Sequence, residues 1–321
     1  MEYTAPTADQ VLALKVCAGI AELAEHDRFA GASEDMVEAI VEGIGALAAG
    51  EWAPLNRAGD TQGARLVDGR VELPAGFAEA YRAYVEAGWG SISAPADFGG
   101  QSLPMSLAAC VLENLGTANM AFNLLPMLTV GAIEAIAHHG SPAQQATYLP
   151  RLISGEWSGT MNLTEPQAGS DVGALRSIAT PIDAGEHAGK YRIKGTKIFI
   201  TWGEHDLASN IVHLVLARTP GVRSPARYAR MVFLSRPRCR AIAEIVQPRL
   251  RSACASMSSS RVSMQTGLPR SLVVVRDRQH RREPHPQGGP HRWGISVSRT
   301  EEIHPSAIRF KSHPRHTGNA R

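Results

Sequence analysis

The sequence predicts an α+β protein: an all-α N-terminal domain (residues 1–155), a partial antiparallel β-barrel or sandwich domain (156–220) and an irregular basic tail (221–321). Three observations carry this prediction. Apolar residues recur at helical spacing in the first part, short β-branched runs between turn residues follow, and the charge balance reverses after Pro220. With 321 residues and 44% hydrophobic content, the chain can bury two cores, which excludes a wholly disordered protein.

The first predicted helix follows Ser33, a residue typical of helix N-caps, and Gly50 is predicted to end it. Its apolar positions are Met36, Val37, Ile40, Val41, Ile44 and Leu47. A second helix before Gly88 is indicated by Phe77, Tyr81, Tyr84 and Val85. Between these two helices, the Asp68-Gly69 turn predicts a short β-hairpin.

Three more helices are predicted before the β region. Residues 103–139 indicate two helices that separate near residues 116–119. The third begins at Ser141, with Pro142 at its first position and Gln144 closing a capping box. Its buried stripe is predicted to be Tyr148, Leu149 and Leu152.

The apolar periodicity changes after Gly155, where short runs rich in β-branched and aromatic residues predict strands. These runs are 157–163, 175–180, 190–193, 196–201 and 211–217. Between the first two lies Thr164-Glu165-Pro166-Gln167-Ala168-Gly169-Ser170-Asp171, which Pro166 and Gly169 keep out of regular structure. Its hydroxyls and close-approaching backbone are compatible with binding a phosphate or a flavin edge. For an isolated fragment of this kind, however, a simple turn between two strands is the stronger interpretation.

Extended to Met161, this run resembles the signature of the acyl-CoA dehydrogenase family over its whole length. The resemblance covers roughly residues 40–220 and includes Gly88-Trp89, Pro95 to Gly100, His139-Gly140, Tyr148 to Pro150, Ser154 to Glu156 and Gly195 to Thr201. Residues 202–206 resemble the branch of the family whose acyl-CoA dehydrogenases have long polypeptide chains. The resemblance therefore implies a helical domain followed by a β domain that together hold FAD.

The cofactor-binding residues that this resemblance implies are Met161, Leu163, Thr164, Gly169, Ser170, Phe199, Ile200 and Thr201. In the family, the counterpart of Thr164 lies near the flavin pyrimidine, and that of Ser170 lies near the FAD phosphates and the thioester substrate. Ser170 is therefore also implied in substrate binding. The position of Phe199 often carries Trp, so the aromatic face beside the flavin is kept here.

The family is known for oxidising an acyl-CoA to the 2-enoyl-CoA, with a carboxylate base taking the α-proton and FAD accepting the β-hydride. An electron-transfer flavoprotein is the expected electron acceptor. In the family, the base lies in or near a C-terminal helical domain through which subunits also associate. No such domain is recognisable here, so the catalytic residue is unknown and homo-oligomerisation does not carry over.

The charge balance sets the tail apart. Residues 1–220 hold 13 Lys and Arg against 25 Asp and Glu, whereas residues 221–321 hold 20 against 5, with 19 Arg and a single Lys. Such composition is typical of a GC-rich gene read out of frame after Gly221, or of a disordered segment. The resulting expectation is an impaired enzyme. The alternatives are an inactive truncated fragment and a flavoprotein-derived chain whose basic tail binds nucleic acid, which the lack of a nucleic-acid motif disfavours.

The remaining signals predict little further chemistry. The four cysteines are scattered, and His280, His285 and His291 lie in the tail without partner cysteines, so no metal site is predicted. Glu204-His205-Asp206 offers acid and base groups without implying a nucleophile. The first residues carry early acidic side chains and no basic-then-apolar pattern, so a secretory signal is not predicted. Asn123, Pro126 and Glu134 interrupt the most apolar stretch of the chain. A cytoplasmic protein without membrane contact is expected.

Overall fold

The computed structural model describes residues 3–68, 70–185 and 187–220, and beyond these the backbone of five strands. Those strands are β8 (Ala229–Ser235), β9 (Ile242–Val246), β10 (Leu272–Arg276), β11 (Gly294–Val297) and β12 (Ile308–Phe310). The rest of the predicted basic tail, with His280, His285 and His291, lies outside the described residues. Whether the tail is out of frame or disordered therefore stays a prediction.

Two compact units make up the chain, and neither is a continuous stretch of sequence. The first holds residues 1–137, 145–160 and 201–212, and the second holds 138–144, 161–200 and 213–321. The first unit is mainly helical and the second contains most of the β structure, so the predicted α+β class is confirmed.

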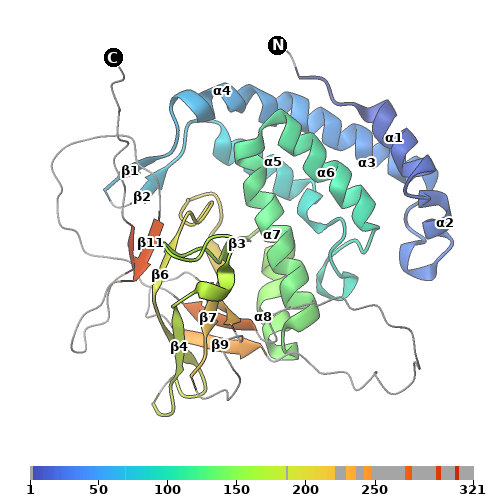
Figure 1. The fold of residues 1–321 in the computed structure, drawn as a ribbon. Helices are drawn as coiled ribbons and strands as arrows, with labels where there is room; N and C mark the ends of the chain where they lie inside the picture. The colour runs from blue at the N-terminus through green and yellow to red at the C-terminus, as the bar shows by residue number, and fades with distance from the viewer. Residues whose placement is uncertain are drawn as a thin grey trace. The chain divides into compact units, whose positions relative to one another are not determined.

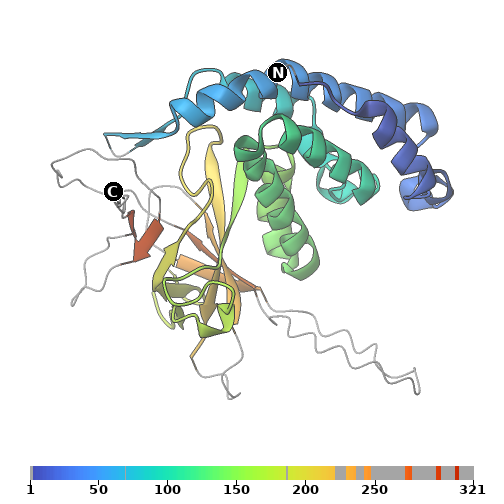
Figure 2. The same ribbon diagram turned by 45° about the horizontal axis from the view of Figure 1, so that its top comes forward.

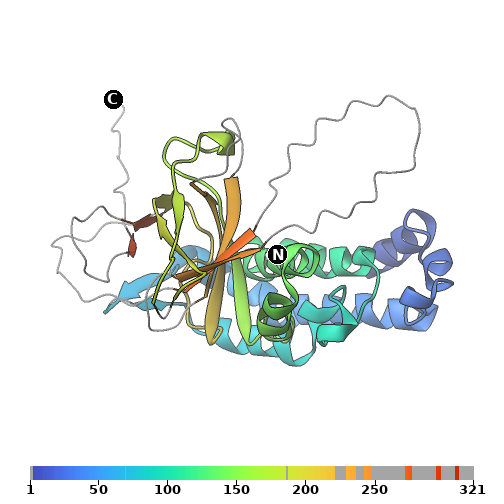
Figure 3. The same ribbon diagram turned by 90° about the horizontal axis from the view of Figure 1, so that it is seen from below.

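The helical unit is built on helices joined by short loops. Its helices are α1 (Thr7–Val16), α2 (Ile20–Ala24), α3 (Glu34–Leu47), α4 (Ala53–Thr61), α5 (Phe77–Glu86), α6 (Met105–Ala118), most of α7 (Met120–His139) and most of α8 (Pro142–Ile153). All three ribbon views place α1 and α2 at one end of this unit (Figure 1, Figure 2, Figure 3). At its other end, β1 (Arg65–Val67) and β2 (Arg70–Glu72) pair antiparallel across Asp68, which confirms the predicted hairpin.

Helix α3 begins where the sequence predicts but is not ended by Gly50. The Ser33 hydroxyl accepts a hydrogen bond from the Met36 N–H at 3.4 Å, as an N-cap does. At the other end, a π-helical turn from Ala48 to Trp52 carries the chain directly into α4. The predicted stop at Gly50 is therefore wrong. The helical path continues because it places the fully buried Trp52 side chain in the core.

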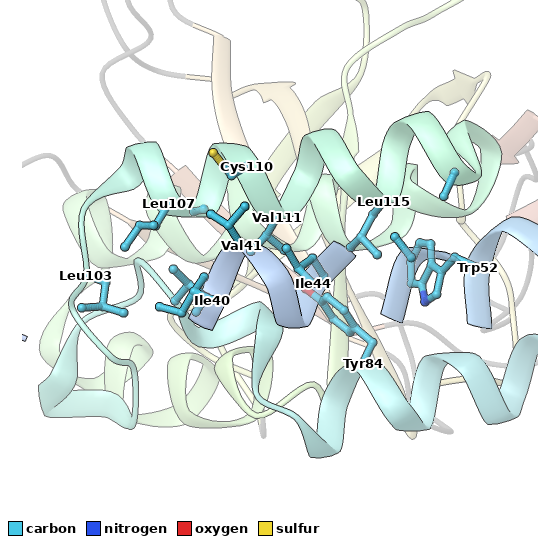
Figure 4. Packing of buried hydrophobic residues seen from close by; sticks show 14 of the residues in the cluster. Ile40, Val41, Ile44, Trp52, Tyr84, Leu103, Leu107, Cys110, Val111 and Leu115 are labelled. Atoms are coloured by element: carbon cyan, nitrogen blue, oxygen red, sulfur yellow. The ribbon is translucent and has the colours of Figure 1, made fainter. Parts of the chain in front are cut away.

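The core of this unit lies where α3 packs along α6 (Figure 4). Val41 and Ile44 of α3 are fully buried, as are Leu107 and Leu115 of α6. Trp52 stacks on Phe122 of α7, with ring centroids 3.9 Å apart and an interplanar angle of 13°. Of the six apolar positions named from the sequence for α3, Val37, Ile40, Val41 and Ile44 are buried, as a 3.6-residue period predicts. Leu47 is half-buried, and Met36 is exposed.

The predicted break between α6 and α7 is present at Asn119, whose φ of −156° and ψ of 88° are not helical. Helix α7 is, among the described helices, the one long and apolar enough to cross a membrane, with a hydropathy of 1.6. Phe122, Leu125, Ala132 and Ile136 are nevertheless fully buried within the helical unit. This burial is typical of a core helix.

The start of α8 confirms the predicted capping box. The Gln144 N–H donates to the Ser141 hydroxyl at 3.3 Å, and the Ser141 N–H donates to Gln144 Oε1 at 2.9 Å. Two N–H groups that the first turn leaves without helical partners are thereby satisfied. The predicted stripe is also buried, and it consists of Tyr148, Leu149 and Leu152.

The larger sheet has the strand order β3-β7-β4-β5-β9-β10-β8, with β3 (Trp157–Asn162), β7 (Asn210–Arg218), β4 (Ile178–Pro181) and β5 (Tyr191–Lys194). A second sheet joins β12, β11 and β6 (Thr196–Ile198). All five predicted strands are present, and β4 pairs antiparallel with β5. The β4–β7 and β8–β10 pairs are parallel, however, so the larger sheet is mixed where an antiparallel one was predicted.

Candidate functional site

The signature loop leaves β3 and makes a tight turn that presents its second half to solvent. Glu165 and Ala168 exchange two backbone hydrogen bonds of 3.0 Å each, which close the turn. Gly169 and Ser170 follow and are exposed, and a Cβ added at Gly169 would meet no other atom within 4 Å. Thr164, before the turn, is half-buried. The loop therefore offers an open backbone flanked by two hydroxyls.

Strand β6 brings the second predicted cofactor-binding segment beside this loop. The Ile198 N–H donates to the Thr164 carbonyl oxygen at 3.0 Å, so the two segments are joined through the backbone. Phe199 then takes a φ of 58°, which ends the strand, and its side chain is 61% exposed. Ile200 is buried, so only its backbone could face a ligand. A bulky residue at positive φ is strained and is commonest at functional sites.

A buried ion pair, which was not predicted from the sequence, joins the same two segments. Lys197 Nζ lies 2.8 Å from Glu165 Oε1, and the two side chains are 4% and 2% exposed. The same ammonium donates to the Leu163 carbonyl oxygen at 2.8 Å. Lysine and glutamate are seldom fully buried unless they are paired. From the sequence alone both residues would be taken as exposed, so the ion pair could be predicted only if their burial were known.

The Glu165 carboxylate accepts hydrogen bonds from four donors. Oε1 accepts from Lys197 and, at 3.0 Å, from the Ser177 N–H. Oε2 accepts from the Arg176 N–H at 2.6 Å and from Gln167 Nε2 at 2.7 Å. Both carboxylate oxygens are therefore saturated, and the loop, the start of β4 and strand β6 meet at one side chain.

The environment of Glu165 favours its charged form. Burial by itself would raise the pKa of this carboxyl, but the hydrogen bonds from Lys197, Ser177 and Arg176 outweigh it and lower the pKa from 4.5 to about 2. Burial lowers the pKa of the Lys197 ammonium, and Glu165 opposes that shift. With a lowered pKa and both oxygens already accepting hydrogen bonds, the Glu165 carboxylate is a weak base near neutral pH.

Acid titration is expected to destabilise the protein through Glu165. Because its pKa is lower in the folded chain, its contribution to the free energy of unfolding is complete above pH 4.5 and is lost as the pH falls toward about 2. The loss amounts to about 3 kcal/mol at 1.36 kcal/mol per pKa unit. Urea unfolding followed by far-UV circular dichroism at several pH values measures it. An identical pH dependence in a variant with Glu165→Gln and Lys197→Met would contradict this assignment.

Thr201 opens a segment of the helical unit that Trp202 and His205 anchor. Trp202 has a φ of 54°, and its indole N–H donates to the Ala121 carbonyl oxygen at 2.9 Å. His205 is buried, with Nδ1 accepting from the Leu207 N–H at 3.2 Å and Nε2 lying 2.9 Å from the Ser158 hydroxyl. Nε2 therefore carries the ring proton and donates to Ser158.

The His205–Ser158 pair does not form a catalytic arrangement, and from the sequence likewise no nucleophile was implied by residues 204–206. In a nucleophile–histidine–carboxylate arrangement, Nδ1 donates to a carboxylate and Nε2 accepts the nucleophile's proton. Here both roles are reversed. Ser158 is also fully buried, so no substrate could reach its hydroxyl.

The residues of the β unit that the sequence singled out fit the edge of a flavin. The hydroxyls of Thr164 and Ser170 make no hydrogen bond to any described residue, so both are available to a ligand. Gly169 lets a ligand approach the backbone, and the exposed ring of Phe199 offers an apolar face. Met161 and Leu163 are half-buried on the approach to the loop. The assignment of each residue to a cofactor contact stays a prediction.

Comparison with known proteins places the helical residues in one family. Residues 35–156 match the acyl-CoA dehydrogenase N-terminal domain. The chain is 49% identical over 220 residues to 3-methylmercaptopropionyl-CoA dehydrogenase of Ruegeria pomeroyi, and the match covers 68% of this chain and 37% of that protein. It is 42% identical over 173 residues to a butyryl-CoA dehydrogenase of Syntrophomonas wolfei, covering 53% of this chain and 28% of that protein. The chain thus spans about a third of the length of these relatives.

Solved structures share the fold. An acyl-CoA dehydrogenase from Bacillus anthracis, complexed with FAD, superposes with a TM-score of 0.52 at 17% identity, covering 76% of this chain and 36% of that one. The butyryl-CoA dehydrogenase of Megasphaera elsdenii superposes with a TM-score of 0.51 at 20% identity, covering 65% and 50%.

Proposed function

Because the chain is a member of the acyl-CoA dehydrogenase family, we propose that it forms part of an FAD enzyme that oxidises an acyl-CoA thioester to the 2-enoyl-CoA. The observation that carries this proposal is the meeting of two segments in the β unit. The Ile198–Thr164 hydrogen bond and the Lys197–Glu165 ion pair bring the signature loop and the strand before Phe199 together. The accessible hydroxyls of the loop and the exposed aromatic ring then lie on adjoining segments.

FAD, when bound, would supply the acceptor for the hydride that leaves the β-carbon of the substrate. The chain's own part is to bind and orient. The Thr164 hydroxyl and the backbone at Gly169 would hold the flavin edge, and Ser170 would lie near the phosphates and the thioester. Phe199 would cover a face of the ring system and limit the access of water to it.

Glu165 does not supply the base that removes the α-proton, because its carboxylate already accepts four hydrogen bonds inside the β unit. We therefore propose that the base lies outside this loop. We also propose an electron-transfer flavoprotein as the acceptor of the electrons. Acyl-CoA thioesters are the substrates that the names of both relatives carry.

The test is to purify the full chain, titrate it with FAD while recording the visible spectrum, and add acyl-CoAs of several chain lengths without oxygen. Bound flavin that bleaches on addition of an acyl-CoA is the result expected of a complete site. Bound flavin that stays oxidised would show a cofactor site without a base in the 321 residues. Failure to bind FAD at saturating concentration would overturn the proposal for this chain.

A substitution at Phe199 tests the cofactor face. Phe199→Ala is expected to weaken FAD binding roughly tenfold, because the variant loses the aromatic contact, whereas Phe199→Trp should bind as the parent does. Quenching of flavin fluorescence measures the affinity. Leu12→Ala is a matched control, since Leu12 is an apolar residue of the helical unit with the same 61% exposure as Phe199. Equal FAD affinity for Phe199→Ala and Leu12→Ala would remove Phe199 from the site.

A further inference from the structure

We propose that Lys197 and Glu165 are positioning residues that hold the two cofactor-facing segments, residues 164–170 and 199–200, in register with each other. The inference rests on the function proposed above. Neither side chain touches a ligand in this scheme. Each acts through the backbone next to it, since Glu165 adjoins Thr164 and Lys197 lies two residues before Phe199.

The register follows from where Lys197 stands. It is the middle residue of β6, and its two neighbours on the strand, Thr196 and Ile198, are half-buried while it is buried. Successive side chains of a strand alternate between its faces, so the ammonium points to one side of β6 and its neighbours to the other. From that side Nζ donates both to the Leu163 carbonyl oxygen and to Glu165, which flank Thr164. One buried side chain therefore bonds to the residues on both sides of Thr164.

Close backbone packing reinforces the same arrangement. A Cβ added at Gly195, just before β6, would lie 2.0 Å from Ser177 Oγ and 2.7 Å from Ser177 Cα. The Ser177 N–H is one of the four donors to Glu165. Strand β6 thus approaches the start of β4 as closely as a glycine allows, and the carboxylate lies at this junction.

An ionised pair serves this purpose better than an apolar one. Beyond Lys197, three donors converge on the carboxylate, namely the Arg176 and Ser177 N–H groups and Gln167 Nε2. An apolar side chain at residue 165 would leave all three without that acceptor. Burying the two charges costs desolvation free energy, and the gain is a fixed geometry of the two segments. Fixing a register is the best-supported use of buried ionic groups in other proteins.

The test uses the full chain with Glu165→Gln and Lys197→Met combined, because the double variant leaves no uncompensated charge and keeps an oxygen acceptor at residue 165. Hydrogen exchange of backbone amides is measured without FAD. We expect exchange in residues 164–170 and 196–200 to quicken together by at least tenfold, with unchanged far-UV circular dichroism. Lys194→Met, at an exposed lysine of β5, is the matched control and should exchange as the parent does.

FAD titration of the same proteins provides the second readout. The double variant should bind FAD at least tenfold more weakly, with a shifted visible spectrum, while Lys194→Met keeps the parent's affinity. Exchange that quickens in one segment alone, or an unchanged FAD affinity in the double variant, would overturn the positioning role. A further outcome is that the parent chain binds no FAD while the double variant still exchanges faster than the parent in both segments together. That result would refute the proposed function and support the link between the two segments.

Discussion

Lys197→Met in the full chain is expected to lower the free energy of unfolding by about 3 to 5 kcal/mol, as the removal of one partner of a buried pair does. The substitution leaves the Glu165 carboxylate buried with three of its four donors and no counter-charge. Methionine fills a similar volume, so the loss reflects the charge and not a cavity. Urea unfolding near pH 7, followed by far-UV circular dichroism, measures the change.

Two further variants separate the charge from the side chain itself. Lys194→Met removes a lysine of the neighbouring strand β5 that is exposed, and it should change the free energy of unfolding little. Adding Glu165→Gln to Lys197→Met should recover a substantial part of the lost stability, because the unpaired charge is then gone. A double variant that is no more stable than Lys197→Met alone would show that the two side chains do not interact as a pair.

Trp52→Ala is expected to cost about 3 to 5 kcal/mol, as large-to-small substitutions of buried aromatic residues do. Trp52 is fully buried, stacks on Phe122 and lies 5.9 Å from the Tyr84 ring. Its removal would leave a cavity where the π-helical turn, α5 and α7 meet. The free energy of unfolding is again read from urea denaturation by circular dichroism, which does not depend on tryptophan fluorescence.

Trp52→Phe is the control for this prediction. The indole N–H of Trp52 is buried without a hydrogen-bond partner among the described residues, so phenylalanine removes a polar group that forms no bond. The phenylalanine variant should therefore lose much less stability than the alanine variant. Equal losses would mean that the indole N–H is satisfied in solution, by a buried water for example.

The two segments of the proposed flavin site were predicted from local sequence patterns. Both segments, around Thr164 and around Phe199, carry motifs that the family resemblance identifies from the sequence. Their meeting through the Ile198–Thr164 hydrogen bond was not predicted, because hydrogen-bond partners distant in the chain leave no periodic signal. The Lys197–Glu165 pair was missed for the same reason, and charged residues are ordinarily taken as exposed.

The sequence by itself determined the elements whose signals are local. The Ser33 cap, the Ser141–Gln144 capping box, the Asp68 turn and the five strands predicted between residues 157 and 217 all depend on residues within a few places of one another. The strands β8 to β12, in the tail that was predicted to be irregular, were not among them. Short-range sterics and hydrogen bonds decide such features, and they are present in the chain before it folds.

Only the tertiary structure decided where contacts between distant segments override these local preferences. Gly50 does not end its helix, because burial of Trp52 against Phe122 outweighs the small helical penalty of a glycine. Phe199 and Trp202 take positive φ values that their side chains disfavour, held on either side by β6 and by the Trp202–Ala121 hydrogen bond. Each of these outcomes is a sum of contacts between distant segments, which no window of sequence contains.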